Sequence, residues 1–263
     1  MAAPVLFVGA GPGDPELITV KGLKALQTAD VVIYAGSLVN PALLAELKPG
    51  AVAHDSAPLN LDQTTALMVD AVAAGKRVVR LHTGDPCLYG AIQEQMERLD
   101  AAGIGYGVIP GVTAAFAAAA SLCQELTLPE VSQTLVLTRI AGRTPVPERE
   151  ALRRLAANGG TLCLYLSVGL IDEVVSELLA GGVFTAATPV AVVYRASWPD
   201  EQVVAGTLAD IAGQVASAGI GRQALILVGE ALAARQRGLK AVSKLYDPDF
   251  IHGYRGGEPP PGA

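Results

Sequence analysis

The chain has 263 residues, of which 51% are hydrophobic and 17% are charged, and its formal net charge at pH 7 is −6. This length predicts two domains, at roughly 100–200 residues per domain, and the composition excludes a disordered chain. The acidic balance argues against a broad nucleic-acid-binding surface, which would be basic. A few arginines in a cleft would still allow an anionic small substrate.

We expect no export signal, no membrane-spanning segment and no metal site in this sequence. No basic segment precedes the early apolar run 5–8, and the weakly polar run 111–123 is shorter than the about 20 residues that span a bilayer. The cysteines and histidines are scattered without metal-ligand spacing, and we expect the cysteines to be buried and structural. We therefore expect a soluble, cytoplasmic protein with no resident metal and no membrane or nucleic-acid partner.

The first half of the chain alternates short apolar strands with amphipathic helices. We expect strands at 5–8, 31–34, 77–81 and 106–109, and helices at 15–27, 62–74, 91–102 and 112–123. Asp14 is a candidate N-cap, with Pro15 at the first helical position. Short, almost wholly apolar strands between helices are typical of a parallel sheet that is buried on both faces.

The second half repeats this alternation after a break that carries Pro129. We expect strands at 134–138, 162–166, 190–194 and 224–228, and helices at 149–156, 171–179 and 208–216. The predicted domains are an N-terminal domain over 1–115, a C-terminal domain over 116–245 and a tail over 246–263. The predicted fold class is α/β, with two α/β domains in series and a ligand cleft between them.

The loop at residues 9–14 (GAGPGD) follows a strand and precedes a helix. It resembles a dinucleotide-binding fingerprint but does not match it, because Asp14 replaces the last glycine and Pro12 has no N–H to offer a pyrophosphate. The pattern alone leaves two interpretations open, a structural turn and a loop that brings backbone close to a ligand.

Two further loops follow strands of the same predicted sheet, at residues 83–86 (TGDP) and 110–115 (PGVTAA). Asp85 could hold a ribose hydroxyl or an ammonium group, or it could cap a helix that begins at Pro86. Because ligands bind at the carboxyl ends of parallel strands, we expect the three loops to converge at one edge of the sheet.

The remaining candidates for chemistry are basic. Arg139 and Arg143 follow a strand and could present two guanidinium groups to carboxylates, although solvated surface charges remain an equal alternative. Arg153 and Arg154 are interpreted as surface charges. His82 is interpreted as a buried, hydrogen-bonded residue in preference to a catalytic one, and no Ser-His-Asp or Cys-His arrangement can be argued from spacing.

The loops occur in the order 8–17 (VGAGPGDPEL), 84–86 (GDP), 110–115 (PGVTAA) and 189–191 (PVA). In this order they resemble the tetrapyrrole methylase family over nearly the whole chain, to about Arg255. Further segments resemble the family members that methylate precorrin-4 at C11 to give precorrin-5 in cobalamin biosynthesis. These are residues 34–39, 54–57, 138–145, 197–201, 244–247 and 252–255. Ala35 and Gly36 stand where uroporphyrinogen-III methyltransferases usually carry an aspartate.

The resemblance implies a homodimer that uses S-adenosylmethionine as methyl donor, releases S-adenosylhomocysteine and acts on a tetrapyrrole. Carried over by position, the cofactor-binding residues would be Pro12, Thr83, Gly84, Asp85, Leu88, Thr113, Ala114, Leu166, Ala196 and Ala224. Leu166 replaces the methionine that is common at its position, and we expect the apolar replacement to preserve binding. Ser37 and Leu38 would shape the ring site, and Arg139 and Arg143 would anchor peripheral carboxylates.

Alternatives to this activity remain open at this point. The substrate could carry cobalt, or the methyl group could go to another ring position. A non-catalytic sensor or carrier of S-adenosylmethionine or a tetrapyrrole would bind without turnover, and an NAD-dependent oxidoreductase is disfavoured by the failed fingerprint. Methyl transfer from a sulfonium needs neither a metal nor a covalent nucleophile, and the sequence identifies no catalytic base.

Overall fold

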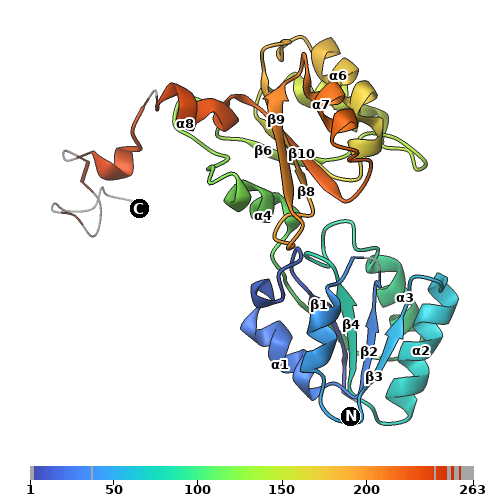
Figure 1. The fold of residues 1–263 in the computed structure, drawn as a ribbon. Coiled ribbons are helices and arrows are strands. Elements are labelled where there is room, and N and C mark those ends of the chain that lie inside the picture. The colour runs from blue at the N-terminus through green and yellow to red at the C-terminus, as the bar shows by residue number, and fades with distance from the viewer. Residues whose placement is uncertain (1–2, 37, 240, 248–249, 252–254, 256–263) are drawn as a thin grey trace. The chain divides into compact units, whose positions relative to one another are not determined.

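The protein consists of two compact units, each with its own sheet (Figure 1). The computed structural model describes residues 3–36, 38–239, 241–247, 250–251 and 255. The first unit comprises Met1–Ser121 and Arg195–Gln202, and the second comprises Leu122–Tyr194 and Val203–Ala263. The expected domain boundary after residue 115 therefore falls inside a helix of the first unit, and residues 195–202 group with the first unit instead of the second.

The first unit contains the predicted parallel sheet. Its strands are β1 (Val5–Gly9), β2 (Val31–Tyr34), β3 (Val52–Asp55), β4 (Val78–His82) and β5 (Tyr106–Ile109). They lie in the order β3-β2-β4-β1-β5, and the four pairings are all parallel. Its helices are α1 (Val20–Thr28), α2 (Leu61–Ala73), α3 (Gln93–Ala101) and α4 (Ala114–Ser121), with 3₁₀ helices at Pro15–Leu17 and Pro41–Glu46. The parallel sheet is thus confirmed, while β3 was not predicted.

Helices cover both faces of this sheet. On one face, Leu26 of α1 packs in a cluster with Leu81 of β4. On the other face, Met68 of α2 and Leu99 of α3 pack with Phe7 of β1. Burying a large apolar side chain of this kind stabilises the fold by about 1.5–3 kcal/mol.

The helix predicted at 15–27 is divided in the structure. The 3₁₀ helix Pro15–Leu17 ends at Ile18, whose backbone is extended at φ −67° and ψ 143°. Thr19 then caps α1, and its side chain accepts a hydrogen bond from the backbone N–H of Gly22 at 3.1 Å. Asp14 caps the short 3₁₀ helix, as predicted, but α1 has its own start.

The sheet of the second unit is mixed. Its strands are β6 (Leu135–Thr138), β7 (Thr161–Leu164), β8 (Pro189–Tyr194), β9 (Gln202–Thr207) and β10 (Ala224–Val228), in the order β6-β7-β10-β8-β9. β6 and β7 are parallel, whereas β10 runs antiparallel to both β7 and β8. Its helices are α5 (Leu152–Ala156), α6 (Ile171–Ala180), α7 (Ile211–Ser217) and α8 (Ala234–Arg237). Further 3₁₀ helices lie at Glu148–Glu150, Val168–Leu170, Glu230–Ala233 and Lys244–Tyr246.

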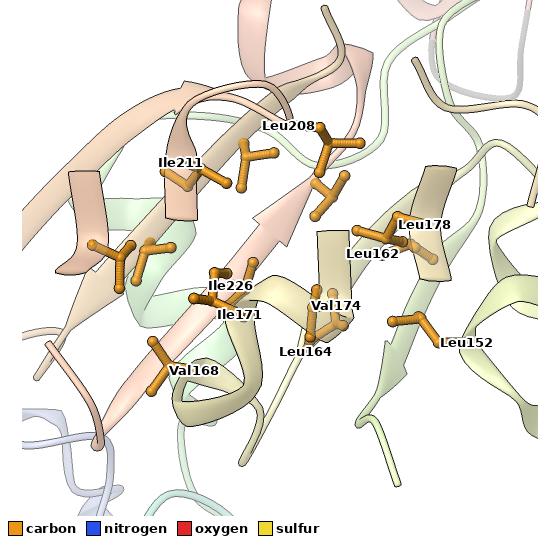
Figure 2. Close-up of a cluster of buried hydrophobic side chains, with 14 of the residues drawn as sticks. Leu152, Leu162, Leu164, Val168, Ile171, Val174, Leu178, Leu208, Ile211 and Ile226 are labelled. Atoms are coloured by element: carbon orange, nitrogen blue, oxygen red, sulfur yellow. The ribbon is translucent and has the colours of Figure 1, made fainter. Parts of the chain in front are cut away.

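The second unit has a separate core of aliphatic side chains. Figure 2 shows Leu164 of β7 beside Val174 of α6 and Ile226 of β10 beside Ile171 of α6. Leu164, Val174 and Ile226 are fully buried. Ile211 of α7 belongs to the same cluster. The α/β character predicted for both halves is therefore confirmed.

The three cysteines differ in their surroundings. Cys163 in β7 is buried, and burial raises the pKa of its thiol to about 12. Cys87 and Cys123 are exposed, so the expectation that all three are buried is wrong for these two. Within the described ranges, no helix is long and apolar enough to cross a membrane.

Candidate ligand-binding site

Three loops meet at the carboxyl edge of the first sheet, where β1, β4 and β5 end. The N–H of Gly84 donates to the carbonyl of Gly11 at 2.7 Å, and the N–H of Gly11 donates to the carbonyl of Gly84 at 3.3 Å. The N–H of Gly111 in the third loop donates to Oδ2 of Asp85 at 2.9 Å. The predicted convergence of the loops is confirmed.

Glycines allow the three loops to touch through their backbones. A Cβ placed on Gly111 would lie 2.1 Å from the carbonyl oxygen of Gly84, and one on Gly9 would lie 2.6 Å from the Cα of Gly111. No larger residue allows backbones to approach this closely. The packed loops concentrate backbone polar groups at the edge where α/β sheets bind ligands.

Asp85 holds two of these loops in place. Its Oδ1 accepts a hydrogen bond from the N–H of Cys87 at 2.8 Å, and its Oδ2 accepts the one from Gly111. The first bond closes a turn at Pro86 and does not cap a helix, since α3 begins only at Gln93. Contact between Asp85 and a ligand stays a prediction.

Most of the predicted cofactor residues lie on these loops. Thr83, Leu88, Thr113 and Ala114 are half-buried there, beside Gly84 and Asp85. Pro12 is buried, and its carbonyl accepts a hydrogen bond from the indole N–H of Trp198 at 2.9 Å. Ala196 is buried in the segment 195–202, which belongs to the same unit.

The loop after β2 adds one predicted substrate residue to this edge. The N–H of Gly36 donates to Oδ1 of Asp55 at 3.0 Å, and the N–H of Ser56 donates to the carbonyl of Tyr34 at 2.8 Å. Leu38 is 39% exposed on this loop. Ser37 lies outside the described residues.

His82 ends β4 directly before the second loop. It is buried, its ring centroid lies 6.0 Å from that of Phe7, and its Nε2 has no hydrogen-bond partner among the described residues. The prediction of a buried histidine is confirmed, whereas the expected hydrogen bond is missing at Nε2. Burial, together with the positive charge of Arg80, lowers the pKa of His82 to about 3, so the imidazole is neutral at pH 7.

Arg80 is a buried charge that sequence reasoning missed. Its Nε donates to Oε1 of Gln95 at 3.0 Å and its Nη1 donates to the carbonyl of Ile33 at 3.1 Å, both within the core. Burial lowers the pKa of Arg80 to about 10, so it remains charged. Its position inside an apolar strand gives no sign of these two partners.

The other predicted residues lie in the second unit. Leu166 follows β7 with 74% of its surface exposed and a backbone φ of 54°. A non-glycine residue rarely adopts this left-handed conformation, which is enriched where backbones are held for function. Ala224 begins β10 and is half-buried.

The two candidate substrate arginines have different surroundings. Arg139 donates from Nη1 to the carbonyl of Thr144 at 3.0 Å and from Nη2 to the carbonyl of Pro145 at 2.6 Å, so it holds its own loop. Arg143 lies on that loop, is exposed, and has no hydrogen-bond or ion-pair partner in the described part of the chain.

Arg153 and Arg154 form ion pairs with Glu177 and Glu148, both at 2.9 Å. More than half of each arginine side chain is exposed, at 61% and 56%. Their interpretation as surface charges is therefore confirmed. Across the described ranges, no cluster of three His, Cys, Asp or Glu side chains could hold a metal ion.

A parallel sheet covered on both faces, with glycine-packed loops at its carboxyl edge, defines an α/β fold of the kind that binds small molecules at that edge. The family model of the Tetrapyrrole (Corrin/Porphyrin) Methylases matches residues 4–212. The chain belongs to this family.

Curated relatives match the chain over almost its whole length. It is 57% identical to the cobalt-precorrin-4 C(11)-methyltransferase of Methanocaldococcus jannaschii, with 95% of each chain covered. It is 52% identical to the precorrin-4 C(11)-methyltransferase of Pseudomonas aeruginosa, covering 97% of this chain and 99% of the relative.

Solved structures agree with these relatives. A cobalt precorrin-4 methyltransferase matches with a TM-score of 0.85 and 50% identity, over 87% of this chain and 95% of that one. The uroporphyrin-III C-methyl transferase of Thermus thermophilus, complexed with S-adenyl homocysteine, matches with a TM-score of 0.72 and 31% identity, over 88% and 93% of the two chains.

Proposed function

We propose that the protein transfers a methyl group from S-adenosylmethionine to C11 of precorrin-4, giving precorrin-5 in cobalamin biosynthesis. The observation that carries this proposal is the similarity, at 52% and 57% identity over nearly full length, to two enzymes that are both named for C11. One name specifies cobalt and the other does not. The proposal therefore covers both the metal-free and the cobalt-loaded substrate, because cobalt would arrive with the tetrapyrrole.

We assign cofactor binding to the three loops of the first unit. The carboxylate of Asp85 and the hydroxyl of the half-buried Thr113 lie on these loops and have polar groups suited to the ribose and the amino-acid end of S-adenosylmethionine. Pro12 and Leu88 offer apolar contact. The S-adenyl homocysteine bound to the Thermus thermophilus relative supports this ligand class. Leu166, Ala196 and Ala224 complete the set of residues that we assign to the cofactor. The exposed side chain and positive φ of Leu166 support its assignment.

We assign tetrapyrrole binding to Ser37 and Leu38 at the ring and to Arg139 and Arg143 at the carboxylates. Arg143 offers a guanidinium that is free to form a bidentate pair with a carboxylate. Arg139 already donates to the carbonyls of Thr144 and Pro145, so its contribution includes holding the loop that presents Arg143.

The proposed reaction is an in-line displacement at the methyl carbon. The bond from this carbon to the ring carbon forms while its bond to sulfur breaks, and the positive sulfonium leaves as a neutral thioether. The protein's contribution is to align the two carbons, and such alignment supplies about 7–11 kcal/mol in favourable cases. His82 is unsuited to removing the ring proton, since its lowered pKa makes it a weak base.

A homodimer and a cytoplasmic location belong to the same proposal. Both rest on the resemblance to the tetrapyrrole methylase family.

The test is to incubate the purified protein with methyl-labelled S-adenosylmethionine and precorrin-4, which is generated enzymatically in the same tube, with and without cobalt in the substrate. We expect one added methyl group at C11, measured by product mass and by the position of the label. Binding of both ligands without transfer would instead indicate a carrier or sensor. A methyl group at another carbon would contradict the ring position and retain the reaction class.

A further inference from the structure

Trp198 is the single tryptophan of the chain, and it lies against the first loop. Its Nε1 donates to the carbonyl of Pro12 at 2.9 Å. A Cβ on Gly13 would lie 2.1 Å from the indole Cδ1, so the ring fills the space that a side chain at residue 13 would need. The indole therefore determines both the direction of one loop carbonyl and the room available to the next residue.

The segment that carries Trp198 is attached to two parts of the site. Its Ser197 Oγ accepts a hydrogen bond from the N–H of Asp14 at 3.0 Å, at the end of the first loop. Glu201 Oε2 accepts one bond from the N–H of Ser197 at 2.6 Å and another from Oγ of Ser121 at 2.7 Å. Ser121 is the last residue of α4, whose first residue is Ala114. The segment thus joins the first loop to the helix that follows the third loop.

The backbone conformation of segment 195–202 is held by contacts within the segment, as its positive φ values and its charged side chains show. Arg195 and Ser197 have positive φ values of 47° and 68°, which non-glycine residues adopt only where the surroundings hold them. The Arg195 guanidinium lies 4.2 Å from the centroid of the Trp198 ring and forms an ion pair with Asp200 at 2.9 Å. A simple connection between β8 and β9 would not need this arrangement.

We propose that Trp198 is a positioning residue for the methyl donor, an inference that rests on the proposed function. The indole N–H engages the Pro12 carbonyl, and the ring keeps Gly13 in place. The loop is thereby held in the shape that S-adenosylmethionine binds. Without the N–H, the carbonyl of the buried Pro12 loses its donor, and the loop must rearrange to find another.

The substitution Trp198→Phe tests this role, because phenylalanine keeps an aromatic ring under Arg195 and loses only the N–H and part of the ring area. We expect the Kd for S-adenosylhomocysteine, measured by titration calorimetry, to rise about threefold to tenfold, the range for one hydrogen bond. The KM for S-adenosylmethionine should rise equally, while kcat at saturating donor and the KM for the tetrapyrrole stay within about twofold.

Tyr106→Phe is the matched control. It also removes one hydrogen bond from an aromatic side chain, the one from Tyr106 Oη to Asp100 at 3.0 Å. Tyr106 is the first residue of β5, so this bond lies at the amino ends of the strands, away from the three loops at their carboxyl ends. We expect its donor affinity to match that of the wild type. If Trp198→Phe does not fold, Ser197→Ala removes the partner of the Asp14 N–H and carries the same expectation.

The outcomes separate the inference from the function on which it rests. If the wild type binds the donor and Trp198→Phe binds it equally well, the positioning role is overturned and the proposed function stands. If both KM values rise by the same factor and the melting temperature falls, the substitution has loosened the whole protein. That result would also overturn the positioning role. If the wild type binds no S-adenosylhomocysteine, the proposed function and the inference both fall.

Discussion

At the scale of single residues, Gly111 sets how closely the three loops approach. In Gly111→Ala the added Cβ would lie 2.1 Å from the Gly84 carbonyl and 2.8 Å from the Cα of Gly9, and these are backbone atoms that cannot turn aside. We expect the free energy of unfolding to fall by about 1–3 kcal/mol, as for other overpacked sites, and the affinity for S-adenosylhomocysteine to fall about tenfold. Denaturant unfolding and titration calorimetry measure the two effects.

Gly105→Ala is the control for this substitution. A Cβ at residue 105 would meet only the Cβ of Pro4, at 3.9 Å, which is ordinary contact. Its free energy of unfolding should stay within about 0.5 kcal/mol of the wild type. Equal effects of the two substitutions would show that close backbone approach is not the reason for glycine at residue 111.

Asp85 shows how far sequence reasoning reaches at this scale. The apolar strand before it predicts that Asp85 lies at the carboxyl edge, and the structure confirms that position. The sequence could not show that Gly111, 26 residues later, donates to its carboxylate, because that bond depends on how the loops pack. The same holds for the unpartnered Nε2 of His82, since a burial pattern does not indicate which polar atoms find partners.

At the scale of elements, the loop after β6 allows the roles of its two arginines to be separated. We expect Arg143→Ala to raise the KM for the tetrapyrrole about tenfold, through the loss of a charge-assisted hydrogen bond, while S-adenosylhomocysteine affinity is unchanged. Arg139→Ala should also weaken tetrapyrrole binding and leave the donor affinity intact, because the carbonyls of Thr144 and Pro145 lose the guanidinium that holds them.

Lysine substitutions distinguish direct contact from loop support. Arg143→Lys keeps a positive charge for the substrate but loses the bidentate fork, so it should restore part of the affinity. Arg139→Lys cannot donate to two carbonyls with a fixed fork and should restore little. Arg153→Ala, at an exposed ion pair with Glu177, is the control and should leave both affinities unchanged. Equal rescue at both positions, or a loss of donor affinity with Arg139→Ala, would contradict these roles.

The strands divide into those that the sequence predicts and those that it does not. β10 was predicted with its observed bounds because its residues form an apolar run in the interior of a sheet. β3 and β9 are edge strands with no buried residue, and their apolar runs are only two or three residues long. The return of Arg195–Gln202 to the first unit was missed because its partners Pro12 and Asp14 are more than 180 residues earlier.

At the scale of the whole molecule, each unit has its own core. The fluorescence of one side chain, Trp198, reports on the unfolding of the first unit. Trp198 belongs to the first unit and is the single tryptophan of the chain. His82 belongs to the same unit, at the end of β4. Unfolding followed by tryptophan emission therefore measures the unit whose stability depends on the protonation of His82.

His82 should make the stability of the first unit depend on pH. Burial and Arg80 lower its pKa from 6.5 in the unfolded chain to about 3 in the folded one. Between these values the unfolded chain binds a proton that the folded chain does not, so stability is full above 6.5 and falls as the pH drops toward 3. At about pH 5 the expected loss is about 2 kcal/mol relative to about pH 7.5.

The substitution His82→Leu isolates this contribution, because leucine is apolar and cannot bind a proton. The difference in unfolding free energy between about pH 7.5 and about pH 5 should be smaller in the variant by about 2 kcal/mol, whatever its absolute stability. Asp30 does not interfere: Lys48 and Arg77 lower its pKa from 3.8 to about 2, so its contribution is lost only at lower pH. An equal pH dependence in wild type and variant would mean that the imidazole takes up its proton in the folded unit as readily as in the unfolded chain. The conclusion that His82 is neutral in the folded protein at about pH 5 would then be wrong.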